Sequence, residues 1–348
     1  TSVSRGLGDV YKRQVMDEFA GGNYDAEEQI AAFYAMIVDK LGDDVTLIAG
    51  ARFESTSINY TGQVFDEEED ELPSDIGSVS GGNDYYNILP NLTLQWDVND
   101  ELNFNFAFTQ SIARPSYYDL VPYEYSNSDD QELALGNPDL KASLSTNFDI
   151  MGEWYFGGLS LLSFGYFSKD IKDWIYQYTT NNYTYAGVNG YELSQLRNGE
   201  KASVSGFELG FQTKFLKNFT FMGNYTSTDS STNNVEGRDD VPLTGQVDDM
   251  YNLSLAFENS KFFVRASMNY ASEALDELSG DAYEDRYYDE QTFVDVNANY
   301  KVNDKLSIFA EGKNLTNQPL RYYQGIQQRT MQIEYYNLSW TLGLKYDF

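Results

Sequence analysis

The sequence NLSWTLGLKYDF, residues 337–348, decides the fold class. Apolar and polar residues alternate strictly along it. Because successive side chains of a strand point to opposite faces, this period of two predicts a β-strand with one apolar and one polar face. The apolar positions are Leu338, Trp340, Leu342, Leu344, Tyr346 and Phe348.

The same alternation recurs upstream, for example at residues 102–109, 207–215 and 294–302. Counting such stretches gives about thirteen strands, many of them near the ~9–11 residues that cross a bilayer at a steep tilt. The connections between them alternate between short and long. Short turns are expected near residues 42–43, 99–100, 157–158, 216–217, 259–260 and 303–304, and long polar connections near 59–83, 114–142, 180–199, 232–247, 274–290 and 318–333.

This pattern predicts an all-β chain that forms a transmembrane, antiparallel, up-and-down β-barrel with short periplasmic turns and long surface loops. If the first strand, near residues 27–40, runs inward, the count places Phe348 at the short-turn end. Bacterial single-chain barrels close with an even number of strands, so an odd count indicates an incomplete barrel. Two unpaired edges would then prevent this chain from closing by itself.

A soluble β-sandwich or propeller is the alternative, because one face of its strands also packs on a core. Soluble strands are typically about 5–6 residues long with short connections, which disfavours that class. Aromatic residues near the expected strand ends would form the belts found at membrane interfaces. They are Tyr85, Tyr86, Trp96, Trp154, Tyr155, Tyr335, Tyr336, Trp340 and Tyr346.

Composition excludes several function classes. Aromatic residues make up 16% of the 348 residues, yet the mean hydropathy is −0.51, as expected when apolar and polar positions interleave. The chain contains no Cys and no His, which removes disulfides, thiolate nucleophiles, His-based metal sites and Ser-His-Asp triads. The net charge of −31 argues against nucleic-acid binding, because the phosphates would be repelled. We predict no catalytic residue, no cofactor and no metal site.

Two motifs carry a family resemblance. Residues 111–122 read SIARPSYYDLVP, and residues 136–141 read GNPDLK. They resemble the strand end in Arg-Pro and the loop with Gly-Asn-Pro-x-Leu of TonB-dependent receptor barrels, and residues 313–317, KNLTN, resemble the end of the penultimate strand. The matching positions are Arg114, Pro115, Leu120, Pro122, Gly136, Asn137, Pro138, Leu140, Asn314 and Leu315.

We interpret these motifs as structural rather than ligand-contacting. Pro115 cannot donate to a strand ladder and suits the place where a strand leaves the sheet. Gly136 to Pro138 have the chemistry of a turn in a long loop. The resemblance further implies that the terminal strand is the signal read by the barrel-assembly machinery, carried by Trp340, Leu342, Leu344, Tyr346 and Phe348.

The resemblance also implies how the chain is organised. Receptors of this family have an N-terminal plug domain, a segment that engages TonB, and a barrel of about 22 strands with a plugged lumen. Residues 15–348 would then be the C-terminal part of such a barrel, roughly its last thirteen strands, without the plug. Residues 1–14, TSVSRGLGDVYKRQ, resemble a translated adapter sequence and are left out of the fold prediction.

The function implied is energy-coupled uptake, across the outer membrane of a Gram-negative bacterium, of a scarce extracellular solute such as an oligosaccharide or a metal chelate. The chain would supply barrel wall and surface loops. Expected partners are membrane lipid and lipopolysaccharide, TonB acting through the plug, the barrel-assembly machinery and, as in one variant of such receptors, a surface lipoprotein. The alternatives are a passive porin-like or structural barrel and a barrel-borne hydrolase, although no carboxylate pair is marked as an acid/base pair.

Tyrosines in the long connections are the candidate ligand contacts. Flat aromatic faces beside hydrogen-bond acceptors suit sugars or cationic solutes, and an acidic rim disfavours anionic chelates. Tyrosine is also common wherever a barrel meets lipid headgroups, so the alternative reading stays open. The acidic run at residues 66–71 is interpreted as a solvated charge run rather than a calcium loop. The candidate ligand residues are Tyr117, Tyr118, Tyr123 and Tyr125.

Overall fold

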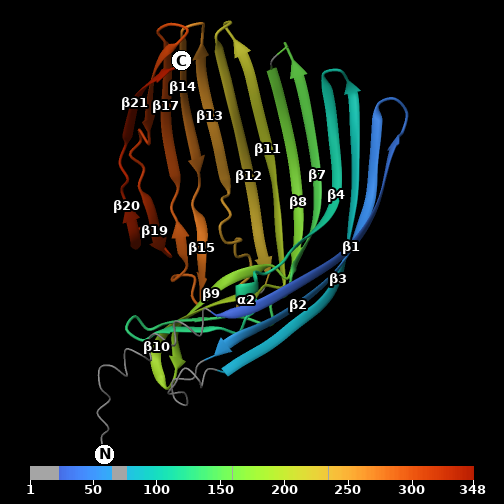
Figure 1. Ribbon diagram of the computed structural model, residues 1–348, viewed down its shortest axis with the longest axis vertical. Coiled ribbons are helices and arrows are strands. Elements are labelled where there is room, and N and C mark those ends of the chain that lie inside the picture. The colour runs from blue at the N-terminus through green and yellow to red at the C-terminus, as the bar shows by residue number, and fades with distance from the viewer. Residues whose placement is uncertain (1–22, 65–76, 159, 234) are drawn as a thin grey trace, which may run out of the picture.

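The computed structural model describes residues 23–64, 77–158, 160–233 and 235–348 (Figure 1). The adapter-like residues 1–14 and the acidic run 66–71 lie outside the described residues. Within the described ranges no helix has the length and apolar character needed to cross a membrane.

A single sheet of 13 strands forms a curved wall (Figure 1). Every neighbouring pair is antiparallel and adjacent in an up-and-down order, which confirms the predicted topology. In sheet order the strands are β1 (Tyr24–Lys40), β2 (Val45–Val64), β3 (Gly77–Asn99), β4 (Leu102–Ala113), β7 (Ser143–Phe156), β8 (Ser160–Lys172), β11 (Lys201–Phe215), β12 (Phe219–Asn233), β13 (Asp249–Glu258), β14 (Phe262–Ala271), β17 (Gln291–Lys301), β18 (Leu306–Lys313) and β21 (Ser339–Tyr346).

The wall has one apolar face that no part of the described chain covers. Phe207 and Leu209 of β11 are 37% and 42% exposed, and Leu342 and Leu344 of β21 are 78% and 70% exposed. A soluble sandwich would bury these side chains between two sheets. The exposed apolar face therefore favours a wall that is solvated by lipid over a wall that encloses a core.

The short turns lie where the sequence places them, and three of them use the same asparagine chemistry. Asn99, Asn259 and Asn303 each accept hydrogen bonds through Oδ1 from the backbone N–H groups two and three residues later, at 2.8–3.0 Å. This side-chain turn satisfies the donors that a tight connection leaves free. The chain ends at the same end of the wall, since the N–H of Asp347 donates to the carbonyl of Lys305 at 2.8 Å, which confirms the predicted position of the C-terminus.

The long connections differ from the sequence prediction. The first is shorter than residues 59–83, because β2 and β3 are 20 and 23 residues long and run into that range. Four others form hairpins that join in a second sheet of eight strands. In sheet order these strands are β20 (Thr330–Glu334), β19 (Leu320–Gln324), β16 (Arg286–Tyr288), β15 (Ala274–Ser279), β9 (Ile175–Tyr185), β10 (Val188–Asn198), β6 (Glu132–Leu135) and β5 (Glu124–Asn127).

We call this second sheet, together with α2 (Tyr117–Leu120) and the segments that join these elements to each other and to the wall, the cap; it comprises residues 114–142, 173–200, 235–248, 272–290 and 314–338. It lies at the end of the wall opposite the short turns (Figure 1). Parallel pairing of β6 with β10 and of β9 with β15 links hairpins from different connections. The cap is thus one folded body rather than a set of separate loops.

The most buried side chains of the molecule gather in the cap rather than in the wall. One cluster contains Trp174, Tyr176 and Tyr178, with Val235 and Leu278 from other connections. A second packs Leu120, Val121 and Leu140 on Ile58 and Tyr60 of β2. The face of the wall that carries Ile58 and Tyr60 is therefore the inner face, against which the cap is folded.

Two aromatic residues expected at the membrane interface lie on the inner face instead. Tyr85 packs against the second cluster of the cap, while its neighbour Tyr86 is 71% exposed. The hydroxyl of Tyr155 donates to Glu153 Oε2 at 3.0 Å, and residues two apart in a strand share a face. The interface prediction is wrong for Tyr85 and Tyr155, because strand alternation sends one tyrosine of each aromatic pair inward.

The wall does not close on itself. Its pairing order begins with β1 and ends with β21, and no pairing joins these two strands within the described ranges. Both edges present apolar side chains, among them Phe33 at 71% exposure and Trp340 at 64%. The described wall is an incomplete barrel, as the odd strand count predicts.

Leu209 tests the orientation of the wall. Leu209→Arg would place a charge in the middle of β11, between Tyr225 of β12 and Phe164 of β8. On a face solvated by lipid this substitution lowers the free energy of unfolding by about 2–4 kcal/mol, measured by denaturant titration, in vesicles, of the receptor that contains this chain. Glu208→Arg on the inner face is the matched control, with little change expected. Equal effects of both substitutions would contradict the assignment of the two faces.

Candidate functional site

Arg114 fastens the start of one cap segment to the wall. Its Nη2 donates to Glu54 Oε2 at 2.6 Å and to Thr56 Oγ1 at 3.1 Å, while its Nε lies 3.6 Å from Glu28 Oε1. Glu54 also accepts from Arg52 Nε at 2.5 Å. The guanidinium thus bridges β1 and β2 immediately after β4 ends at Ala113.

The residues after Arg114 turn the chain into the cap. Pro115 is followed by Ser116, whose hydroxyl caps the short helix α2 by accepting from the N–H of Asp119 at 3.4 Å. Leu120 is 3% exposed and lies in the cluster with Ile58 of β2. Pro122, which comes next after Val121, is half-buried. The Arg-Pro segment therefore leads directly into the interface between cap and wall.

The Gly-Asn-Pro segment lies against the same interface. A side chain at Gly136 would meet the carbonyl oxygen of Val121 at 1.8 Å, so only glycine fits there. Asn137 donates through Nδ2 to the carbonyl of Leu196 in β10 at 2.8 Å, and its N–H donates to the carbonyl of Asp119 at 2.7 Å. Pro138 then directs the chain to Leu140, which is 2% exposed in the second cluster.

The four candidate tyrosines lie close together in sequence but face different surroundings. The ring of Tyr118 stacks on Tyr123 with centroids 4.1 Å apart and 19° between planes. The hydroxyl of Tyr117 donates a hydrogen bond to Glu28 Oε2 at 3.2 Å, so Tyr117 and Arg114 contact the same carboxylate. Tyr125 in β5 is 40% exposed. Tyr118 at 37% exposure and Tyr125 are thus the members that keep an accessible ring without a charged partner.

Asn314 and Leu315 end β18 with backbone contacts. Asn314 has a left-handed backbone with φ 53°, its N–H donates to Asp295 Oδ1 at 2.8 Å, and its Oδ1 accepts from the N–H of Gln318 at 2.8 Å. The N–H of Leu315 donates to the carbonyl of Val294 at 2.8 Å. This turn aims the following segment toward β19 and β20 in the cap.

The five residues of the predicted assembly signal lie along one edge of the wall. Trp340, Leu342, Leu344 and Tyr346 of β21 pair with Gly312, Ala310, Ile308 and Leu306 of β18 and are 53–78% exposed. Phe348 follows at the end of the chain, with its ring 5.4 Å from that of Tyr346. The structure therefore places all five side chains where another molecule can reach them.

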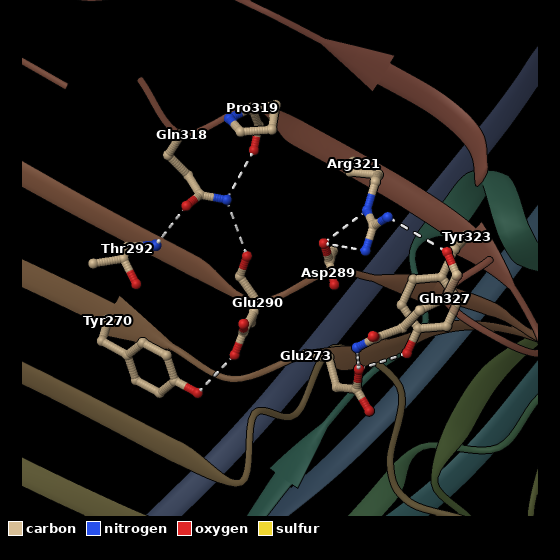
Figure 2. A network of polar contacts seen from close by, with 10 residues as sticks. All are labelled: Tyr270, Glu273, Asp289, Glu290, Thr292, Gln318, Pro319, Arg321, Tyr323 and Gln327. Atoms are coloured by element: carbon tan, nitrogen blue, oxygen red, sulfur yellow. Dashed lines mark hydrogen bonds and ion pairs between the residues drawn. The ribbon is translucent and has the colours of Figure 1, made fainter. Parts of the chain in front are cut away.

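A polar network holds the two C-terminal cap hairpins against the wall (Figure 2). Gln318 is central to it, accepting from the N–H of Thr292 at 3.3 Å and donating to the carbonyl of Glu290 at 3.2 Å. Arg321 pairs with Asp289 at 2.7 Å. Glu273 Oε2 accepts from the hydroxyl of Tyr323 at 2.6 Å and from Gln327 Nε2 at 3.2 Å.

A buried ion pair joins three cap segments. The carboxylate of Asp285 is fully buried and accepts from Arg238 Nη1 at 2.9 Å and Nη2 at 2.6 Å. It also accepts from the N–H of Ser279 at 2.9 Å, and the carbonyl of Asp285 accepts from the N–H of Gly325 at 2.8 Å. Such a carboxylate is stable in the interior because it is paired with a cation and each of its two oxygens accepts at least one hydrogen bond.

Most cationic side chains of the cap are already neutralised. Beyond the pairs of Arg114, Arg238 and Arg321, Arg197 contacts Glu236 at 2.5 Å and Arg286 contacts Asp276 at 2.5 Å. In the described part of the cap, the cations without an ion pair are Lys141 and Arg329. Because the chain carries 54 acidic and 23 basic residues, the field around the cap is negative.

A cavity of about 390 Å³ opens between the inner face and the cap. Its wall side is formed by the ends of β4 and β7, and its cap side by Trp174, Ile175 and residues 243–246. No lining residue carries an ionisable group. This volume lies in the range typical of small-molecule sites, about 300–1,000 Å³.

The chain matches the family model described as TonB dependent receptor-like, beta-barrel, over residues 5–315. The chain belongs to this TonB-dependent receptor family. A search of curated protein sequences finds no match. Membership of this family implies an outer-membrane location, which agrees with the exposed apolar face of the wall.

Solved receptors share the fold at low sequence identity. The ferric-catecholate import receptor Fiu from Escherichia coli K12 is 16% identical with a TM-score of 0.68, and the match covers 93% of this chain and 45% of that one. The copper transporter OprC is 14% identical with a TM-score of 0.69, covering 93% and 48%. The siderophore receptor PiuA from Acinetobacter baumannii is 14% identical with a TM-score of 0.66, covering 93% and 44%. The receptor chain thus spans about half the length of these proteins.

The sequence did not reveal the residues of the receptor chain whose contacts form only when the cap folds. Trp174, Arg238 and Asp285 received no role, and the cap segments were expected to be polar loops. A signal was present, because Tyr176 and Tyr178 alternate with polar residues in the manner of a strand. Which side chains meet across the connections depends on pairing between segments that are distant in sequence.

Asp285 tests whether the ion pair holds the cap together. Asp285→Ala leaves the half-buried Arg238 without its partner and the N–H of Ser279 without its acceptor, which costs up to about 3 kcal/mol. We expect faster amide hydrogen exchange in β15, β16 and residues 235–248, with the wall unchanged. The control is Asp170→Ala, which removes an exposed pair with Lys201 at 3.8 Å and changes nothing measurable. Unchanged exchange in Asp285→Ala would show that the pair is dispensable.

The cap should also be sensitive to alkali. Burial, and then the charge of Glu236, raise the pKa of Tyr176 to about 12 from its usual value near 10. The folded cap therefore favours the neutral phenol, and this contribution to stability is complete below pH ~10 and is lost as the pH rises to about 12. Tyr176→Phe should reduce the alkaline loss of cap stability, followed by hydrogen exchange, whereas Tyr125→Phe should not. Identical alkaline profiles of the two variants would contradict this cause.

Proposed function

We propose that this chain forms wall and cap of an outer-membrane receptor that takes up an extracellular solute by TonB-dependent transport. The observation that carries the proposal is the combination of an apolar outer face with a folded cap that occupies the inner face. The outer face is suited to lipid, and the cap supplies a surface that can select a solute.

The folded cap favours coupled uptake over passive diffusion. A passive pore needs an open aqueous path through the barrel. Here Leu120, Val121 and Leu140 pack on the inner face, and the ion pair of Arg238 with Asp285 fixes neighbouring segments. A path past such a body requires a movement, and TonB acting through a plug domain is the energy source that family membership suggests.

The proposed partners follow from the surfaces. Lipid and lipopolysaccharide would contact the exposed apolar face. The barrel-assembly machinery would read β21, whose apolar side chains end in Phe348. The cap would face the cell exterior, where a surface lipoprotein could cover it. The relatives are receptors and transporters, which supports a role in transport rather than in catalysis.

Uptake measured in cells tests the proposal. Cells that carry the receptor are given labelled neutral oligosaccharides and labelled metal chelates in separate assays. We expect accumulation of one class, reduced to the background of a receptor-deletion strain when TonB is deleted or the proton-motive force is collapsed. Accumulation that persists without TonB and without the proton-motive force would show a passive barrel and overturn the proposal.

A further inference from the structure

The uncharged cavity between wall and cap has the chemistry of a solute site. Three of its lining residues, Ser111, Ser143 and Ser145, bring hydroxyls from the ends of β4 and β7. Thr244 and Gln246 add polar groups from the cap, and Trp174 adds an aromatic ring. A mixture of hydroxyls, one amide and apolar surface is the kind of lining that orients a small molecule.

The hydroxyls are arranged so that they can accept and donate. Ser143 donates to the carbonyl of Asp173 at 2.9 Å, and Ser145 donates to Asn147 Oδ1 at 2.6 Å, so both oxygens keep lone pairs for an incoming donor. Ser111 accepts from Asn147 Nδ2 at 3.3 Å, and its own proton has no acceptor within the described residues. The site thus offers both kinds of hydrogen-bonding group.

Trp174 is held in place beneath the cap. Its side chain is 4% exposed and stacks on Tyr176 with centroids 4.6 Å apart. A side chain at Gly199 would meet the indole nitrogen at 2.1 Å, so glycine is needed for the ring to sit there. The indole N–H has no acceptor among the described residues. That N–H is buried beside Gly199, so Trp174 contributes the surface of a fixed aromatic ring to the cavity and no hydrogen-bond donor.

Charge decides which solutes this cavity can take. None of its lining residues could balance an anion, and most arginines of the cap are committed to carboxylates. An anionic solute would have to approach through a negative field and then lose its hydration without a counter-charge. A neutral solute rich in hydroxyl groups meets neither penalty.

We infer that this cavity, lined by Ser111, Ser143, Ser145, Trp174, Thr244 and Gln246, is a binding site for an uncharged, hydroxyl-rich solute such as a neutral oligosaccharide. The inference rests on the proposed uptake function and specifies the class of solute and where it binds. The serine hydroxyls and Gln246 would exchange hydrogen bonds with sugar hydroxyls, and apolar surface beside them would contact the face of the ring.

Calorimetric titration of the receptor that contains this chain, purified in detergent, tests the inference. The probes are a mixture of neutral gluco-, manno- and xylo-oligosaccharides and the same mixture after sulfation. We expect the neutral mixture to bind, and the sulfated mixture to bind at least about tenfold more weakly at low salt, because like charges repel. Absence of binding by the neutral mixture, or equal binding of both mixtures, overturns the inference.

Variants locate the site. Ser145→Phe fills the cavity and should weaken neutral binding at least about tenfold, since the ligand loses its space. Ser267→Phe is the matched control, because Ser267 lies on the inner face of β14, with its hydroxyl 3.4 Å from that of Ser254 and outside the cavity lining. Ser145→Ala removes one hydroxyl without filling the space and keeps the test valid if the larger substitution prevents folding. We expect a loss of about two- to tenfold from it.

The two proposals fail in different ways. Equal binding by Ser145→Phe and Ser267→Phe, or full binding by Ser145→Ala, places the neutral solute elsewhere and overturns the inference. TonB-dependent accumulation of an anionic chelate, without binding of neutral sugars, also overturns it but leaves the uptake function standing. Passive accumulation overturns the uptake function alone.

Discussion

Backbone hydrogen bonding between neighbouring strands is the constraint on which the rest of the structure depends. A wall in lipid has no water to satisfy its N–H and C=O groups, so each strand must pair along its length on both sides. β11 does this with β8 and β12, residue by residue. The pairing fixes the register, and the register fixes which side chains face lipid and which face inward.

The strands of the cap satisfy their backbone hydrogen bonds in a different way. Its hairpins are too short to be stable by themselves, because two isolated strands are marginal in water. They become stable by joining edge to edge and by packing Trp174, Tyr176 and Leu278 into a shared interior. The ion pair of Arg238 with Asp285 then fixes segments that are distant in sequence. The cavity between cap and wall is therefore lined by segments that these contacts hold together.

Charged residues have different roles in the wall and in the cap. On the inner face of the wall, Glu28, Glu54 and Arg114 form a charged cluster that holds the cap against the wall. Most arginines of the cap form ion pairs within it, and the lining of the cavity carries no ionisable group. Arginines that pair with carboxylates inside the cap are not available to hold an anion, which is the basis of the solute class that we propose.

The sequence by itself determined the wall. Strict alternation, as from Leu338 to Phe348, is a local property of the chain. The short turns are likewise determined by local residues such as Asn99 and Asn303. The number of strands, the antiparallel order, the end at which the chain terminates and the family could be predicted because each depends on neighbouring residues. The alternation could not say which tyrosine of the pair Tyr85 and Tyr86 turns inward, since that depends on the register.

Only the tertiary structure decided the cap and the candidate site. Ser145 lies in β7 and Gln246 lies about a hundred residues later, and nothing in either segment predicts that they line one cavity. The parallel pairing of β9 with β15 and the contact of Arg238 with Asp285 are likewise products of chain reversal over long distances. The physical reason is that local periodicity selects the face a side chain points to, whereas its partner is selected by how the whole chain packs.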